Sequence, residues 1–61
     1  MIKEGQEITY EEAIKAGWLL DGEGALNGTK YWRWVTLASP DGKLMVTFHW
    51  SMIEGTVERA E

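Results

Sequence analysis

The clearest pattern in the chain is a pair of segments, residues 31–39 and 43–52, in which aromatic and β-branched side chains recur at every second position. Such alternation predicts two β-strands. The segment that joins them, Ser-Pro-Asp-Gly-Lys over residues 39–43, favours a type I turn followed by a glycine bulge, because Pro40 presets the first turn position and Gly42 accepts a positive φ. The two strands are therefore predicted to form an antiparallel hairpin.

The predicted turn also sets which residues face each other across the hairpin. It pairs Ala38 with Leu44, and side chains alternate along each strand, so every second residue lies on the same face. The face that we expect to be buried carries the aromatic residues Trp32, Trp34, Phe48 and Trp50. The opposite face, which we call the outer face, is predicted to carry a mixed set: Tyr31, Arg33, Val35, Leu37, Met45, Thr47, His49 and Ser51.

A second pattern, with apolar residues three and four positions apart, predicts one short helix over residues 8–17. Thr9 and Glu12 have the spacing of a capping box, which satisfies free amides at the start of a helix. Gly17 is placed to end the helix in the left-handed conformation. A helix of about two turns is unstable alone, so we expect it to pack on the sheet.

Three weaker segments complete the predicted fold. Residues 18–21 are a short apolar run typical of a strand, residues 22–29 are a glycine-rich loop by composition, and residues 56–60 favour a last strand with Val57 facing inward. A hairpin alone is rarely stable, so at least one of these segments should extend the sheet. The prediction is a single domain, residues 1–61, of the α+β class: one short helix packed on a small antiparallel sheet of three or four strands, centred on the hairpin 31–39/43–52.

The composition narrows the range of functions. Among 61 residues, 6 are basic and 10 acidic, which gives a net charge of −4, and this balance disfavours binding to nucleic acid or to an anionic membrane. No apolar run is long enough to span a membrane and the first residues lack a signal-peptide pattern, so we expect a cytoplasmic protein. With no cysteine and a single histidine, no metal site and no cofactor is predicted.

Catalysis is disfavoured by spacing. His49 and Ser51 lie on the same face of a predicted strand, but side chains two positions apart are separated by about 6–7 Å, which is too far for a base to contact a nucleophile. We therefore expect a protein that is not an enzyme.

Three surface features are candidate binding sites. The first is the outer face of the hairpin, where apolar groups rimmed by polar ones are typical of an interaction surface. The alternative is that another element of the fold covers this face. Its predicted partner-binding residues are Val35, Leu37, Met45, Tyr31, Arg33 and His49. The second is an acidic patch predicted where the two ends of the chain meet, comprising Glu4, Glu7, Glu11, Glu12, Glu54 and Glu58. The third is the second hairpin strand, which carries little charge to protect a free sheet edge and so favours a homodimer.

These features favour a non-catalytic protein–protein interaction module. A small, acidic, cysteine-free domain fits the profile of phage- or mobile-element-encoded inhibitors that bind and occlude a host or defence protein. Two alternatives stay open. One is binding of single-stranded nucleic acid or a small ligand through Tyr31, Arg33 and any exposed tryptophan, and the other is a structural subunit of a larger assembly.

Overall fold

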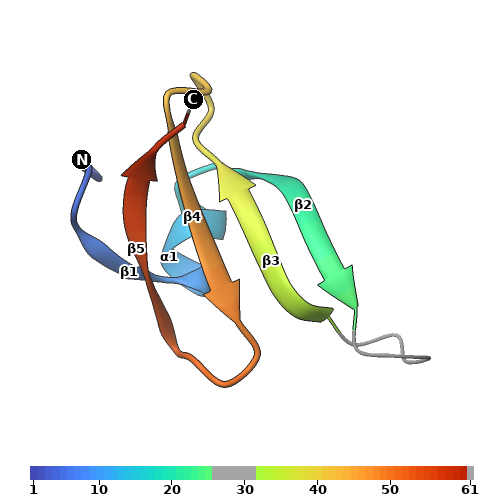
Figure 1. The fold of residues 1–61 in the computed structure, drawn as a ribbon. Helices are drawn as coiled ribbons and strands as arrows, with labels where there is room; N and C mark the ends of the chain where they lie inside the picture. The colour runs from blue at the N-terminus through green and yellow to red at the C-terminus, as the bar shows by residue number, and fades with distance from the viewer. Residues whose placement is uncertain (26–31, 61) are drawn as a thin grey trace.

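The computed structural model describes residues 1–25 and 32–60, and it is an antiparallel β-sheet with one short helix (Figure 1). The strands form one five-stranded sheet in the order β1-β5-β4-β3-β2. The α+β class is confirmed, but the predicted number of strands, three or four, is wrong. Residues 26–31, which include the predicted binding residue Tyr31 and half of the predicted loop, lie outside the described residues, as does Glu61. The elements in chain order are β1 (Glu7–Thr9), α1 (Tyr10–Lys15), β2 (Leu19–Ala25), β3 (Trp32–Ala38), β4 (Leu44–His49) and β5 (Glu54–Arg59).

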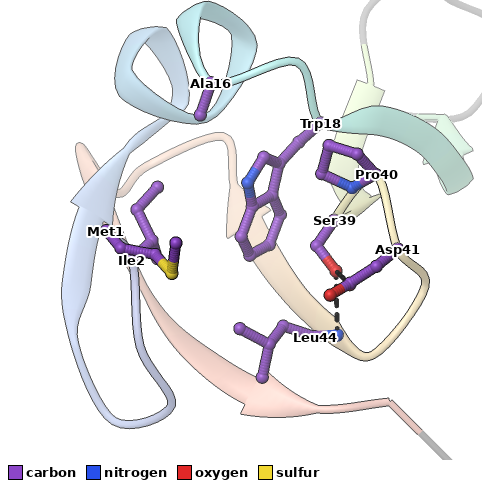
Figure 2. A pocket seen from close by; sticks show the side chains of 8 residues that line it. All are labelled: Met1, Ile2, Ala16, Trp18, Ser39, Pro40, Asp41 and Leu44. Atoms are coloured by element: carbon purple, nitrogen blue, oxygen red, sulfur yellow. Dashed lines mark hydrogen bonds between the residues drawn. The ribbon is translucent and has the colours of Figure 1, made fainter.

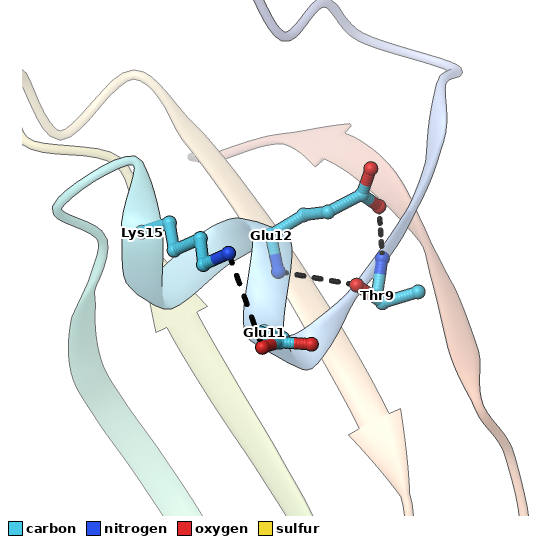
Figure 3. Close-up of polar contacts among 4 residues, drawn as sticks. All are labelled: Thr9, Glu11, Glu12 and Lys15. Atoms are coloured by element: carbon cyan, nitrogen blue, oxygen red, sulfur yellow. Dashed lines mark hydrogen bonds and ion pairs between the residues drawn. The ribbon is translucent and has the colours of Figure 1, made fainter.

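Helix α1 has the predicted cap and stop residues, but it spans Tyr10–Lys15 and is shorter than the predicted range 8–17. The Thr9 hydroxyl accepts a hydrogen bond from the Glu12 amide at 3.1 Å, and the Glu12 carboxylate accepts one from the Thr9 amide at 2.7 Å (Figure 3). Gly17 has a φ of +87°, the left-handed conformation expected after the helix. The residues before the cap form strand β1 rather than helix, because Ile8 pairs with Gly55 of β5 and is buried.

The hydrophobic core lies on one face of the sheet, which α1 helps to cover (Figure 1). The Tyr10 ring, at the start of α1, meets the Phe48 ring edge-on with a centroid distance of 5.6 Å. Val57 is buried in β5, which confirms the predicted last strand and its inward residue. The buried apolar residues that form the core are Ile8, Ala13, Trp18, Val35, Leu37, Val46, Phe48 and Val57.

The hairpin between β3 and β4 forms as predicted, but its register is wrong by one residue. The structure pairs Ala38 with Met45 and Leu37 with Val46, whereas the predicted turn pairs Ala38 with Leu44. A shift of one residue moves a strand's side chains to the opposite face of the sheet. The shift falls on β3, because the predicted inward residues of β4, such as Val46, do lie in the core.

The cause is a turn that is one residue longer than predicted. The Ser39 amide donates to the carbonyl oxygen of Leu44 at 2.9 Å, which leaves four residues in the loop. The Leu44 amide donates to the Ser39 hydroxyl at 3.0 Å, and the Lys43 amide donates to the Asp41 carboxylate at 3.0 Å. The Asp41 and Ser39 side chains thus supply acceptors for the amides of Lys43, the extra loop residue, and of its neighbour Leu44. These hydrogen bonds stabilise the longer loop.

The register decides which large side chains reach the core. Val35 and Leu37 are 2% and 1% exposed, so their predicted position on the outer face is wrong. Trp34, which was expected inside, is 37% exposed because of this shift. Trp50, also expected inside, is 65% exposed for a different reason, because β4 ends at His49 and Trp50 lies in the loop that follows. Among the tryptophans whose side chains the structure describes, the one in the core is Trp18, which follows the helix.

Strand β2 continues into the glycine-rich segment that the composition predicts to be a loop. The predicted strand over residues 18–21 is confirmed from Leu19 onward, but β2 extends to Ala25 and pairs with β3 along its length. Gly22 and Gly24 lie in this strand beneath the Trp34 side chain, where side chains of their own would meet the indole. Gly24 therefore makes room for Trp34, whereas a Cβ atom on Gly22 would only be in ordinary contact with the ring.

Candidate functional site

The predicted partner-binding residues do not form one surface. Val35 and Leu37 lie in the core and are inaccessible to a partner. Met45 is half-buried and His49 exposed, and their pairing with Ala38 and Trp34 places both on the outer face. Arg33 is also exposed.

The acidic residues at the two ends of the chain are brought together by the pairing of β1 with β5. Glu7 lies opposite Thr56, and Thr56 stands between Glu54 and Glu58 on the same face of β5. These three glutamates line a shared open hollow of about 570 Å³. The pairing of β1 with β5 thus brings the acidic segments at the two ends of the chain together.

Each of the other three glutamates of the predicted patch has a partner of its own. Glu4 forms an ion pair with Arg59 at 3.6 Å, and Glu11 forms one with Lys15 at 4.0 Å, four residues further along α1 (Figure 3). Glu12 belongs to the capping box. The predicted single patch is therefore divided, and half of it lies in the hollow.

We call this hollow the acidic groove. It lies over the outer face of β4 and β5 and beside the loop that joins them. Its side chains carry three carboxylates and one imidazole, so the groove has a negative potential that favours a cationic ligand. The residues that line it are Glu7, Thr47, His49, Ser51, Met52, Ile53, Glu54, Gly55, Thr56 and Glu58.

The loop between β4 and β5 exposes large apolar side chains beside the groove. Trp50, Met52 and Ile53, which we call the apolar tip, are 65%, 58% and 82% exposed. The loop is tied back by hydrogen bonds from the Trp50 amide to the Arg33 carbonyl and from the Met52 amide to the His49 carbonyl. Adjacent exposed apolar groups rimmed by charge are typical of an interaction surface, and tryptophan and methionine are enriched there.

Sequence reasoning missed this tip because it extended the second strand to Met52, whereas β4 ends at His49. The sequence did contain one signal of this tip. Two adjacent apolar residues, Met52 and Ile53, interrupt the alternation that marks the strand.

A second hollow, of about 430 Å³, lies between the N-terminal residues, the end of α1 and the β3–β4 turn (Figure 2). Ile2, Trp18 and Leu44 supply most of its apolar wall. The Ser39 hydroxyl donates to the Asp41 carboxylate at 2.7 Å, so these two polar groups satisfy each other at the rim. Hydrogen bonds from the Lys43 amide, which has the larger effect, and from the Ser39 hydroxyl lower the pKa of Asp41 and so favour the charged carboxylate.

The edges of the sheet bear on the predicted homodimer. Strand β4, expected to offer a free edge, lies in the centre between β3 and β5, so that expectation is wrong. The long edge strand is β2, which carries Asp21 and Glu23. An antiparallel pair of β2 strands centred on Gly22 would place each Asp21 opposite the other copy's Glu23, so charge repulsion opposes dimerisation there.

Among the described residues, no group of three or more His, Asp or Glu side chains is arranged to hold a metal ion. Within the same residues, no helix has the length and apolar character needed to cross a membrane. His49 and Ser51 both line the acidic groove.

Comparison with known proteins adds no relative. No protein-family model, no curated protein and no solved structure matches the chain. Fold and surface together define a small antiparallel α+β domain that carries an acidic groove beside an apolar tip.

Proposed function

We propose that this protein is a non-catalytic protein-binding module that docks on a basic surface of another protein through the acidic groove and the apolar tip. One observation carries the proposal. Met52 and Ile53 are more than half exposed, yet they line the same hollow as Glu7, Glu54 and Glu58. Apolar side chains held open to water beside a concentrated negative charge are best explained by a partner with the complementary surface.

The two halves of this surface would contribute differently to binding. Burial of the apolar tip supplies affinity, at roughly 25 cal/mol for each Å² of apolar surface removed from water. The carboxylates speed the encounter with a basic partner and disfavour acidic ones. A module of this kind acts by covering the surface that it binds, which is the mode of action of an occluding inhibitor of a host or defence protein.

The exposure of Trp34 and Trp50 supports a second candidate, the binding of single-stranded nucleic acid by base stacking. The carboxylates of the acidic groove share the outer face with Trp34 and would repel a phosphate backbone. The protein partner is therefore favoured over the nucleic acid.

Affinity capture with a matched pair of variants tests the proposal. The groove variant Ile53→Ser/Glu54→Lys and the control Ile14→Ser/Glu11→Lys each replace one exposed isoleucine and one exposed glutamate, so both carry the same charge. The control changes lie on α1, outside the acidic groove. Circular dichroism establishes first that both variants are folded.

We expect a protein that is captured by the parent and the control but lost by the groove variant. Its affinity, measured with the purified pair, should fall as salt rises, because the attraction is between exposed charges. A partner that binds all three proteins equally, or whose affinity is indifferent to salt, would contradict the proposal.

A further inference from the structure

Trp34 lies flat along strand β2. A Cβ atom built on Gly24 would overlap Nε1 of the indole and lie 2.7 Å from its Cε2 atom. A Cβ atom built on Gly22 would lie 3.7 Å from Cζ3, at the other end of the ring system. The indole therefore extends over both glycines, with its five-membered ring above Gly24 and its six-membered ring above Gly22.

This packing fixes the ring and leaves one of its faces free. The glycines have no side chains to hold the indole away from the backbone, and an aromatic ring over a glycine stabilises a sheet. Trp34 nevertheless remains 37% exposed, so a substantial part of the side chain is open to solvent. A rigid exposed ring binds a ligand without first losing rotational freedom.

The surroundings of the ring indicate the charge of its ligand. The cross-strand partner of Trp34 is His49, which lines the acidic groove together with Glu54 on the next strand. The face of an indole is itself negative because of its quadrupole. Both contributions favour a cation, and the carboxylates of the acidic groove repel the phosphate that a nucleotide carries.

Among protein cations, the guanidinium group suits this position better than an ammonium group. It is planar, it is weakly hydrated, and it stacks on aromatic faces. Neighbouring strands are about 4.8 Å apart, so Trp34 and Glu54, two strands apart, are separated by about 10 Å across the sheet. An extended segment covers that span in about three residues, at about 3.3 Å for each.

We propose that Trp34 is the binding platform for an arginine side chain of the partner, whose guanidinium group stacks on the exposed indole face while a second cation, about three residues away in an extended segment, reaches the acidic groove. The inference rests on the proposed function and names the chemistry of the partner.

The test uses nuclear magnetic resonance with a short peptide as the probe. The indole N–H signal of Trp34, assigned with Trp34→Phe, is followed while acetyl-Arg-Gly-Gly-Arg-amide is added at low salt. The control peptide replaces arginine by citrulline, which has nearly the same shape and no charge. We expect a saturable shift of the Trp34 signal and at least fivefold weaker binding of the citrulline peptide.

A second variant separates the platform from the fold. Gly24→Ala places a methyl group where the indole lies, so Trp34 must leave its position although the residue is still present. We expect this variant to bind the arginine peptide at least threefold more weakly than the parent. Gly42→Ala, in a turn with nothing within 4 Å of the added atom, should bind it as the parent does.

An unmoved Trp34 signal, equal binding of the citrulline peptide, or a larger shift with an oligothymidine than with the arginine peptide would each overturn the inference. These failures are distinct from a failure of the proposed function. If the groove variant loses its partner while the Trp34 signal is unmoved by arginine, the arginine platform alone is wrong. If arginine binds Trp34 while the groove variant captures its partner normally, the groove assignment is wrong.

Discussion

Replacing Gly55 by alanine should destabilise the protein more than any other glycine substitution in a described strand. Gly55 is buried in β5, and a Cβ atom there would lie 2.5 Å from the carbonyl oxygen of Thr47 and 2.9 Å from Cγ2 of Val46. The first distance is about 0.9 Å short of the 3.4 Å at which ordinary contact begins. Since the obstacle is the backbone of the central strand β4, β5 itself must move, and β1 with it.

The expected loss follows from the cost of overpacking. An extra methyl group in a packed core costs about 1–3 kcal/mol, and the loss of backbone freedom in the unfolded chain returns about 0.4–1 kcal/mol. Because two strands must shift, we expect a net loss of about 2 kcal/mol. A domain of this size has a total stability of roughly 3–5 kcal/mol, so about half would be lost. The melting temperature should fall by about 8–16 °C.

Urea denaturation followed by circular dichroism measures this loss, and Gly42→Ala is the matched control. Gly42 has a φ of +77° and nothing within 4 Å of an added Cβ atom, so alanine there costs only the left-handed backbone conformation, about 1 kcal/mol. If Gly55→Ala loses no more stability than Gly42→Ala, the close approach of β5 to β4 at this position is wrong.

Three further predictions test the cap, the turn and the faces of the sheet. Thr9→Ala removes the cap of α1 and should lower the free energy of unfolding by about 1 kcal/mol in thermal denaturation. The amide of Lys43 lowers the pKa of Asp41, so this carboxylate stabilises the fold at pH values above its unfolded pKa. The stabilisation disappears as the pH falls through the lower folded pKa. The resistance of Asp41→Asn to urea should therefore fall less between pH 5 and pH 2 than that of the parent. Leu37→Glu should unfold the protein, as measured by circular dichroism, because Leu37 is 1% exposed. Met52→Glu, at an exposed position, should change the free energy of unfolding by less than about 0.5 kcal/mol.

The elements set by local signals could be predicted from the sequence. The start of α1 depends on Thr9 and Glu12, which contact each other directly, and its end depends on the conformation of Gly17. Strand β1 could not be predicted in this way. It is a three-residue strand that exists through its pairing with β5, nearly fifty residues further along the chain.

The turn between β3 and β4 shows why register was beyond the sequence. The residues Ser-Pro-Asp-Gly-Lys are compatible with a loop of three residues or of four, and Gly42 takes a positive φ as predicted. The difference lies in hydrogen bonds from the backbone amides of Lys43 and Leu44 to side-chain oxygens. Both bonds join residues of the turn itself, and the residue types alone do not show which loop makes them, so turn composition does not choose between the two loops.

The hydrophobic pattern of β3 does not choose between the two registers either, because both faces of this strand carry large apolar side chains. One face carries Val35 and Leu37, and the other carries Trp34. Strand β2 favours the observed register, because Gly22 and Gly24 leave space for an indole on the outer face. If Trp34 were turned inward, no side chain would fill that space. The compact branched side chains then fill the core, and the tryptophan remains at the surface beside His49 and the acidic groove. The register that completes the core thus also creates the exposed aromatic surface on which the proposed recognition of arginine depends.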